Sequence, residues 1–275
     1  MILDANGRSF QYLRLSITDV CNYRCGYCLP NGYIEEAPRR FLDINEIHHL
    51  VTGFAELGLW KVRLTGGEPT VRKDFAEIAA AVSAIPGIRK VATTTNGYQL
   101  AKHAQLWRDA GISAINISID SLDPANFHRI TGMDHLERVL AGVDAAEAAG
   151  FEDIKINTVL LKDLNHHELD RFLNFVKGRR ISLRFIELME TGDNHAYFER
   201  HHLSADVIIN ALRERGWSPV ARDIAAGPAQ EFSHPEHLGK IGIIAPYAKD
   251  FCQTCNRLRV TARGDLRLCL FGDGG

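Results

Sequence analysis

Residues 14–28 read RLSITDVCNYRCGYC, and they place Cys21, Cys25 and Cys28 directly after a short run that is typical of a β-strand. The spacing is C-x3-C-x2-C. Three thiolates on so short a loop can hold three irons of a cubane iron–sulfur cluster and leave the fourth iron open. Structural zinc takes four protein ligands, and this loop has no histidine. The stretch therefore favours a cluster with one open iron over a zinc site or three unrelated thiols.

The chain around this loop alternates strand and helix patterns up to about residue 187. Strands are predicted at Leu13–Thr18, Lys61–Thr65, Val91–Thr95, Ala114–Ile119, Ile154–Leu160 and Leu183–Glu187. Helices are predicted between them at Ile44–Leu57, Asp74–Ala84, Ala101–Ala110, Leu136–Ala149 and His167–Val176. Repeated βα units indicate a parallel sheet, because each helix returns the chain to the start of the next strand.

Polar or glycine-rich stretches follow these strands, among them TGGEP, TTNG, SID and ELMETGD. Barrels built from βα units carry their chemistry on the loops at the carboxyl ends of the strands. One shared pocket is therefore expected, in an α/β fold with a partial (β/α)6 TIM-type barrel. The adjacent Gly66 and Gly67 of TGGEP would let the backbone approach a ligand closely.

The rhythm changes after residue 190. Residues 204–215 predict a helix with Ser204 as its N-cap. Short strands are expected at Ile241–Ile244, Leu258–Thr261 and Leu266–Leu270. We therefore expect two domains, a barrel over residues 1–200 and a smaller C-terminal α+β iron–sulfur domain over residues 201–275.

A second cysteine group, C-x2-C-x13-C, consists of Cys252, Cys255 and Cys269. By spacing alone, a zinc ribbon completed by His234 or His237 is as good an interpretation as an iron–sulfur cluster.

Arg257 and Arg259 lie beside the second cysteine group. On a strand both point to one face, where paired guanidinium groups suit a triphosphate. A zinc module would not need them, so they favour the cluster; the competing interpretation is a solvated charged edge.

The overall composition excludes some functions. The formal charge of −2 and the pI near 6.6 provide no basic field for nucleic acid. No apolar run approaches the roughly 18–20 residues of a membrane span, and no secretory signal is visible. We expect a cytoplasmic protein with reduced cysteines.

The stretches RLSITDVCNYRCGYC, RLTGGEP, TTNG, NISID, KINTV, RFIELM and FCQTCNRLRVT resemble, in this order, the GTP 3′,8-cyclase family of radical S-adenosylmethionine (SAM) enzymes. The resemblance extends from Arg14 to Phe271. It implies two [4Fe-4S] clusters, the first binding SAM and the second binding the guanine of GTP. It also implies SAM contacts from Tyr27, Gly67, Ser118 and Met189.

For GTP, the resemblance implies contacts from Arg14, Arg63, Thr94, Lys155, Arg257 and Arg259, with Lys61 and Arg184 as weaker candidates, and a catalytic role for Arg14, Arg257 and Arg259. Cations on barrel strands need an anion if they face the interior, and a triphosphate supplies one.

The reaction implied by the resemblance begins with a 5′-deoxyadenosyl radical, which abstracts the 3′ hydrogen of the GTP ribose. The carbon radical then attacks carbon 8 of the purine. A MoaC-type downstream enzyme and a homodimer are the implied partners. Family members usually extend some tens of residues further and end in a paired glycine, so we expect this chain, which ends at Gly275, to be shortened.

Two alternatives stay open. One is a radical SAM enzyme with an auxiliary cluster that modifies a peptide, although NRLRVT argues against it. The other is a non-catalytic iron–sulfur redox protein, in which TGGEP and the cationic strand positions would have no role.

Overall fold

A computed structural model describes residues 2–3, 9–35, 40–191, 194–221, 227–248, 251 and 256–267. Its main feature is a curved 11-stranded sheet. The middle of the sheet consists, in spatial order, of β3 (Tyr12–Ser16), β4 (Lys61–Thr65), β5 (Lys90–Thr95), β6 (Ile112–Ser118), β7 (Asp153–Leu160) and β8 (Ser182–Glu187). Neighbours in this series pair in parallel. The predicted parallel sheet and partial barrel are thereby confirmed.

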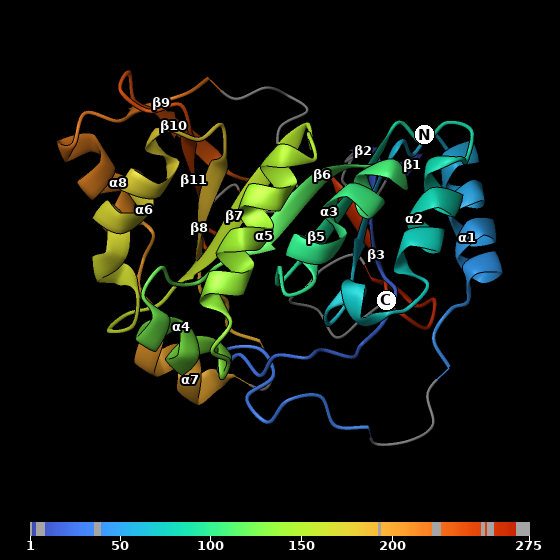
Figure 1. Ribbon diagram of the computed structural model, residues 1–275, viewed down its shortest axis with the longest axis horizontal. Coiled ribbons are helices and arrows are strands. Elements are labelled where there is room, and N and C mark those ends of the chain that lie inside the picture. Colours follow the sequence, from blue (N-terminus) through green and yellow to red (C-terminus); the bar gives the residue numbers. More distant parts are fainter. Residues whose placement is uncertain are drawn as a thin grey trace.

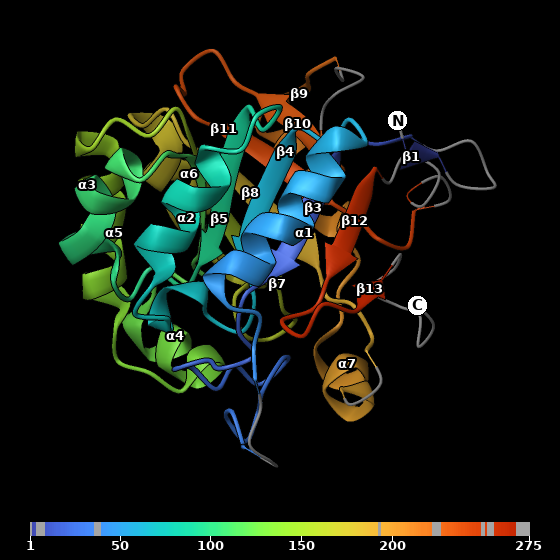
Figure 2. The same cartoon turned by 90° about the vertical axis from the view of Figure 1, so that its right-hand side faces the viewer.

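Helices cover the outer face of the curved sheet (Figures 1 and 2). They are α1 (Ile44–Glu56), α2 (Phe75–Ser83), α3 (Leu100–Asp109), α5 (Leu136–Ala148) and α6 (Leu169–Lys177), the last preceded by a 3₁₀ turn at His166–Glu168. The start of α1 is fixed locally, because Asp43 and Glu46 form a reciprocal capping box. Two shorter helices, α4 (Pro124–Thr131) and α7 (His195–His201), lie at the bottom of Figure 1.

The strands show why one face of the sheet is left for a site. In β3, β7 and β8 every second residue is buried, and buried apolar residues such as Leu13 and Leu15 join the core under the helices with Ile47 and Val51 of α1. Alternate residues of a strand point to opposite faces. The intervening residues, polar in most strands, therefore face the interior of the barrel.

The chain after residue 201 adds strands to both edges of this sheet. β11 (Lys240–Ile244) pairs in parallel with β8, followed outward by β10 (Gln230–Ser233) and β9 (Ser218–Pro219). At the other edge β12 (Arg257–Val260) pairs in parallel with β3, and β13 (Leu266–Arg267) pairs with β12. A short hairpin, β1 (Ile2–Leu3) with β2 (Ser9–Phe10), precedes β3. The domain division at residue 200 stays a prediction.

Two expectations about local structure need correction or remain open. The helix predicted from Ser204 is α8 (Asp206–Glu214), with Ala205 at the N-cap position. The Ser204 hydroxyl still accepts the Asp206 backbone N–H at 3.2 Å. Ser204 therefore makes a capping hydrogen bond from the position just before the N-cap. The helices α4 and α7 were not expected. The strand predicted at Leu266–Leu270 is described only to Arg267. Within the described residues no helix is long and apolar enough to cross a membrane.

Candidate functional site

The first cysteine group follows β3, at the carboxyl ends of the parallel strands. Cys21 and Cys25 are half-buried and pack against the core, whereas Cys28 is exposed. Burial and the negative charges of Glu68 and Cys28 raise the pKa of Cys21 to about 11, and burial also raises the pKa of Cys25. Ionising these thiols therefore needs a compensating cation. Iron would provide it, and three thiolates on one loop are a donor set that fits a cubane cluster.

The TGGEP segment after β4 packs backbone to backbone on this loop. A Cβ atom at Gly66 would lie 2.2 Å from the Thr18 carbonyl oxygen, and one at Gly67 would lie 2.4 Å from that of Val20. Gly66 also has φ +154, a conformation that side chains disfavour. The Gly67 N–H donates to the Thr18 carbonyl at 2.9 Å. Only glycines allow this close approach.

Glu68 of the same segment organises the neighbouring strand ends. Its carboxylate is 2% exposed and accepts hydrogen bonds from the Thr70 backbone N–H, the Thr70 hydroxyl, the Thr95 hydroxyl and the Asn96 backbone N–H, at 2.6–3.1 Å. Asn96 in turn donates its side-chain amide to Asn22 of the cysteine loop at 2.8 Å. The loops after β3, β4 and β5 are thus held in one network.

Two of the predicted SAM contacts, Tyr27 and Ser118, lie close to a carboxylate that the sequence analysis did not identify. The Tyr27 hydroxyl donates to Asp120 at 2.8 Å, and Asp120 also accepts the Val159 N–H at 2.8 Å. Burial raises the pKa of Asp120 to about 6. Ser118 ends β6 two residues before Asp120, opposite Asn157 of β7.

Met189, another predicted SAM contact, follows β8 and is half-buried. Its carbonyl oxygen accepts the side-chain amide of Asn194 at 3.0 Å, and the same amide lies 3.3 Å from the Tyr27 carbonyl oxygen. Tyr27, Gly67, Ser118 and Met189 therefore all lie on segments at the carboxyl ends of the barrel strands. Their roles as ligands of SAM stay predictions.

The residues predicted to bind GTP project from neighbouring strands into the barrel. Across β12, β3 and β4, Arg259, Arg14 and Arg63 lie side by side in register. In the same three strands, Arg257, Tyr12 and Lys61 form a second such row. On the other side Asn116 is paired with Lys155, and Asn157 with Arg184. Burial lowers the pKa of Arg184, and the positive charge of Arg63, four strands away in the sheet, also lowers it. One interior thus gathers Arg14, Lys61, Arg63, Thr94, Lys155, Arg184, Arg257 and Arg259.

This interior carries an excess of positive charge. Burial and then Arg257, Arg63 and Arg259 lower the pKa of Arg14 to about 10, although Tyr12 opposes them. Burial would raise the pKa of Tyr12, but Arg63 and Arg14 outweigh it and bring it to about 8.

The ion pairs within the described part of this interior are few. Asp153 pairs with Lys155 and with Lys90, and Glu231 pairs with Arg184 and Lys240. Arg63 is 6% exposed and donates to the Tyr12 hydroxyl, the Thr93 carbonyl and the Thr94 hydroxyl at 2.5, 2.7 and 3.2 Å. Among the described residues, no carboxylate pairs with Arg63. A polyanion would supply the missing negative charge.

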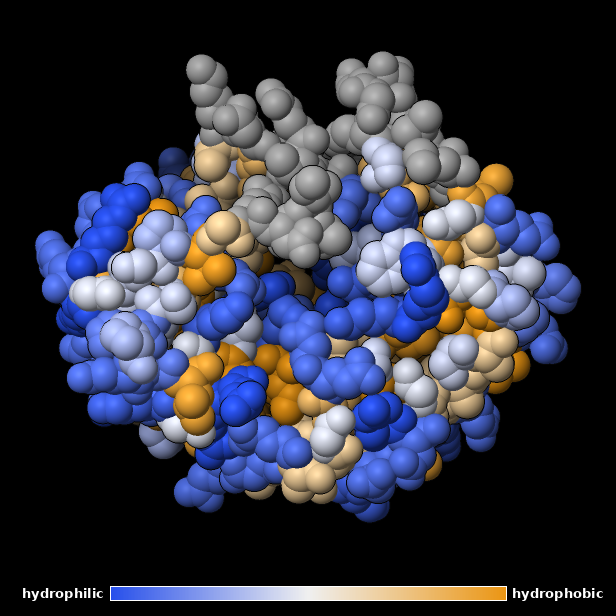
Figure 3. Space-filling model, turned by 90° about the horizontal axis from the view of Figure 1, so that it is seen from above, coloured by the Kyte–Doolittle hydropathy of each residue, from blue (hydrophilic) through white to orange (hydrophobic). Residues whose placement is uncertain are grey.

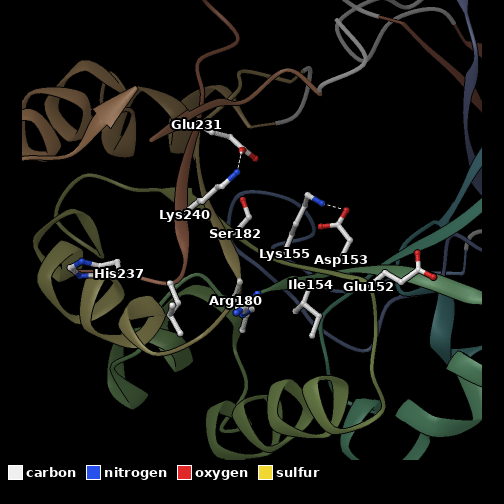
Figure 4. Close-up of a pocket in the computed structure, with 11 residues that line it drawn as sticks. Glu152, Asp153, Ile154, Lys155, Arg180, Ser182, Glu231, His237 and Lys240 are labelled. Atoms are coloured by element: carbon white, nitrogen blue, oxygen red, sulfur yellow. Dashed lines mark hydrogen bonds and ion pairs between the residues drawn. The ribbon is translucent and has the colours of Figure 1, made fainter. Parts of the chain in front are cut away.

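A cavity of about 500 Å³ opens at the amino ends of β7, β8 and β11. Figure 3 shows hydrophilic side chains around a central hollow at this end of the barrel. Lys155, Asp153, Ser182, Glu231 and Lys240 line the cavity, and Figure 4 shows two ion pairs among these residues, Asp153 with Lys155 and Glu231 with Lys240. The buried Ser182 Oγ has no hydrogen-bond partner among the described residues, nor has the buried Arg184 Nε. Such atoms are suited to a polar ligand.

The remaining predicted residues are placed differently. Cys252, Cys255 and Cys269 lie outside the described residues. His234 and His237, considered as zinc ligands, have their Nδ1 atoms 3.2 Å apart and pack against Trp217. Tyr12 and Asn194 were missed because nothing in their local sequence distinguishes them. Asp120 lies in the quoted NISID stretch but was given no role, because its partner Tyr27 is brought to it only by the fold.

Family models match both parts of the chain. The model of the radical SAM superfamily matches residues 15–176, and that of Molybdenum Cofactor Synthesis C matches residues 181–275. A curated GTP 3′,8-cyclase of Klebsiella pneumoniae subsp. pneumoniae is 57% identical over 276 residues, covering 100% of this chain and 84% of the relative. A GTP 3′,8-cyclase of Cronobacter sakazakii is 56% identical with the same coverage.

Solved structures share the fold at low identity. Streptococcus suis SuiB bound to S-adenosylmethionine has a TM-score of 0.71 and 14% identity, covering 96% of this chain and 61% of that chain. Native anSMEcpe with bound AdoMet and the Cp18Cys peptide has a TM-score of 0.58 and 15% identity, covering 74% and 58%. These likenesses support the radical SAM fold.

Proposed function

Because this chain belongs to the GTP 3′,8-cyclase family of the radical SAM superfamily, we propose that it converts GTP to (8S)-3′,8-cyclo-7,8-dihydroguanosine 5′-triphosphate for molybdopterin biosynthesis, as a lyase. The single observation that carries the proposal is 57% identity to a curated GTP 3′,8-cyclase over the full chain. The cation-rich barrel interior is the physical support, since a triphosphate matches its charge.

Cys21, Cys25 and Cys28 would hold a [4Fe-4S] cluster with one open iron. A reduced cluster of this kind supplies the electron that cleaves bound SAM to methionine and a 5′-deoxyadenosyl radical. The chain's own part is to hold SAM beside it. The backbone of Gly67, tied to the cysteine loop through Thr18, would contact SAM together with Tyr27, Ser118 and Met189.

GTP would bind across the barrel from SAM. Arg14, Arg63, Lys155, Arg257 and Arg259 would neutralise the triphosphate, with Thr94, Lys61 and Arg184 beside them. Guanidinium groups fixed by neighbours, as Arg63 is by Tyr12 and Thr93, hold their donors in place without reorganisation. Holding the ribose 3′ carbon beside the radical source is the main contribution of such a site.

Several finer assignments belong to the same proposal. Cys252, Cys255 and Cys269 would hold a second [4Fe-4S] cluster whose open iron binds the guanine. Arg14, Arg257 and Arg259 would act directly on the reacting GTP. The barrel of residues 1–200 and the region 201–275 would be the two functional domains of a cytoplasmic homodimer. A MoaC-type enzyme would receive the product.

The activity is tested by anaerobic incubation of the reconstituted protein with SAM and dithionite, with GTP, with ATP or with neither nucleotide. The expected result is strong formation of 5′-deoxyadenosine with GTP only, together with the cyclised nucleotide. Slow SAM cleavage that GTP does not stimulate would overturn the cyclase proposal and favour another substrate.

The second cluster is tested separately by iron content. Replacing Cys252, Cys255 and Cys269 together by alanine should lower the iron count from about eight to about four per chain. The triple replacement of Cys21, Cys25 and Cys28 should lower it by the same amount and abolish SAM cleavage. Stoichiometric zinc instead of iron at the C-terminal cysteines would contradict the two-cluster proposal.

A further inference from the structure

Asn194 joins two segments that are far apart in the sequence. Its side-chain Nδ2 donates to the carbonyl oxygen of Met189 at 3.0 Å and lies 3.3 Å from the carbonyl oxygen of Tyr27, to which it also donates. Tyr27 belongs to the cysteine loop after β3, and Met189 follows β8. Because β3 and β8 lie five strands apart in the sheet, the backbone ladder does not set the distance between these loops. The amide of Asn194 does.

The orientation of this amide is fixed by its other end. Asn194 Oδ1 accepts the Thr191 backbone N–H at 2.8 Å, so the oxygen and the nitrogen of the amide cannot exchange places without losing that bond. The Asn194 carbonyl also accepts the Phe198 N–H at 2.8 Å within the first turn of α7. The residue is therefore held by its backbone and by its acceptor, and its two donor hydrogens face the two carbonyl groups.

The cysteine loop needs such a contact, because it has no regular structure of its own here. Ile130 and Thr131 at the end of α4 accept the Gly26 and Arg24 N–H groups at 3.0 and 3.2 Å. The Tyr197 ring of α7 lies so close to Gly26 that a Cβ there would be 2.8 Å from it. The loop is thus packed against α4 and α7. Among the described residues, Asn194 is the one whose side chain donates a hydrogen bond to the Tyr27 carbonyl.

We propose that Asn194 is a positioning residue for SAM: it fixes the carbonyl groups of Tyr27 and Met189 at the separation that SAM binding requires. A carbonyl oxygen accepts two hydrogen bonds. Asn194 uses one acceptor position on each oxygen and leaves the other for a donor of SAM, which carries an amine, ribose hydroxyls and an ammonium group. The inference rests on the proposed function, in which Tyr27 and Met189 contact SAM.

The test compares Asn194→Asp and Asn194→Ala with wild type. Aspartate keeps the size of the side chain and the acceptor for Thr191, but it turns the donor into an oxygen facing two carbonyl oxygens. Alanine only removes the bonds. His195→Gln is the matched control, since His195 is the next residue, is largely exposed and contacts Glu190 and Glu199 instead.

The readouts are iron content, the SAM dissociation constant from anaerobic equilibrium dialysis and the GTP dissociation constant. We expect SAM to bind about tenfold more weakly to Asn194→Asp and less severely so to Asn194→Ala, with iron content and GTP binding near wild type. Rescue of turnover by high SAM concentrations should accompany the change, so that KM for SAM rises more than kcat falls.

Unchanged SAM binding in Asn194→Asp, or an equal loss in His195→Gln, would overturn the inference. If both Asn194 variants fail to hold the first cluster while His195→Gln holds it, Asn194 serves the folding of the loop and the inference is also wrong. Dialysis of SAM does not depend on GTP turnover. A wild-type protein that binds SAM but neither binds nor converts GTP would therefore refute the proposed function. The comparison of SAM binding between the Asn194 variants and wild type would still be valid.

Discussion

The Tyr27 hydroxyl donates to the buried carboxylate of Asp120 across 2.8 Å, and this bond joins the cysteine loop to the end of β6. The partners are 93 residues apart in the sequence. Asp120 has a second donor in the Val159 N–H. Because Asp120 is only 2% exposed, water cannot readily replace a lost donor.

Replacing Tyr27 by phenylalanine should therefore destabilise the fold by about 1–3 kcal/mol, because it leaves a buried carboxylate short of one donor. Urea unfolding of the cluster-free protein measures the change. Tyr33→Phe is the control, since the Tyr33 hydroxyl bonds to no described residue. Equal unfolding free energies for the two variants would show that the Tyr27–Asp120 bond contributes nothing.

Glu68 offers a sharper case, because its carboxylate accepts four hydrogen bonds from the strand ends around it. Glu68→Gln places an amide NH₂ where only acceptors fit, so one or more donors lose their partner. We expect a loss of about 1–3 kcal/mol in the free energy of unfolding and poorer reconstitution of the first cluster. Glu77→Gln, on the exposed face of α2, should stay within about 0.5 kcal/mol of wild type. A Glu68→Gln protein as stable as Glu77→Gln would refute the structural role.

The barrel could be predicted from the sequence because the patterns that indicate its strands and helices are local in the chain. Alternating apolar residues mark strands such as β7, and each lies one helix away from its neighbour in the sheet, so order along the chain becomes order in space. The cysteine loop and TGGEP are likewise continuous stretches. Alternation along a strand likewise predicted that Arg257 and Arg259 share one face, whereas Arg14, Arg63 and Lys155 were identified only through the family resemblance.

What could not be predicted depends on contacts between distant segments. Nothing local indicates that β12 pairs with β3 while β11 pairs with β8, so that the chain after residue 201 extends both sheet edges. Asp120 and Asn194 each bond to a residue of the cysteine loop, Tyr27, that is 93 and 167 residues away. The predicted N-cap at Ser204 was wrong by one residue, because the Ser204 hydroxyl bonds in the turn before α8 and Ala205 occupies the N-cap position.

The pH dependence of GTP binding should reflect two interior groups. Burial, Arg184 and Lys90 bring the pKa of Lys155 down to about 8 despite its partner Asp153, and Tyr12 has a pKa of about 8 beside Arg63. Lys155 loses its positive charge and Tyr12 gains a negative charge as the pH rises through 8. Both changes disfavour a polyanion, so the dissociation constant of GTP should rise steeply between about pH 7.5 and 9.

Variants separate these two contributions. Lys155→Arg keeps its charge above pH 8 and Tyr12→Phe cannot ionise, so each should flatten part of the profile and the double variant most of it. Lys102→Arg, on the exposed face of α3, is the control and should keep the wild-type slope. Isothermal titration at constant ionic strength gives the profiles. A double variant with the wild-type slope would show that the titrating groups lie elsewhere.

In the proposed GTP site, Glu231 is a carboxylate that would oppose binding of the triphosphate. Its carboxylate lies 3.8 Å from the Arg184 guanidinium and 3.3 Å from the Lys240 ammonium, so it competes with a triphosphate for both cations. Glu231→Gln keeps the shape and removes the charge. GTP should then bind about threefold to tenfold more tightly at low ionic strength, and the gain should shrink near 1 M salt, where the Debye length is about 3 Å. Glu236→Gln, an exposed carboxylate on the adjoining loop, should leave the affinity unchanged. Weaker binding in Glu231→Gln would mean instead that Glu231 holds Arg184 in the orientation that GTP needs.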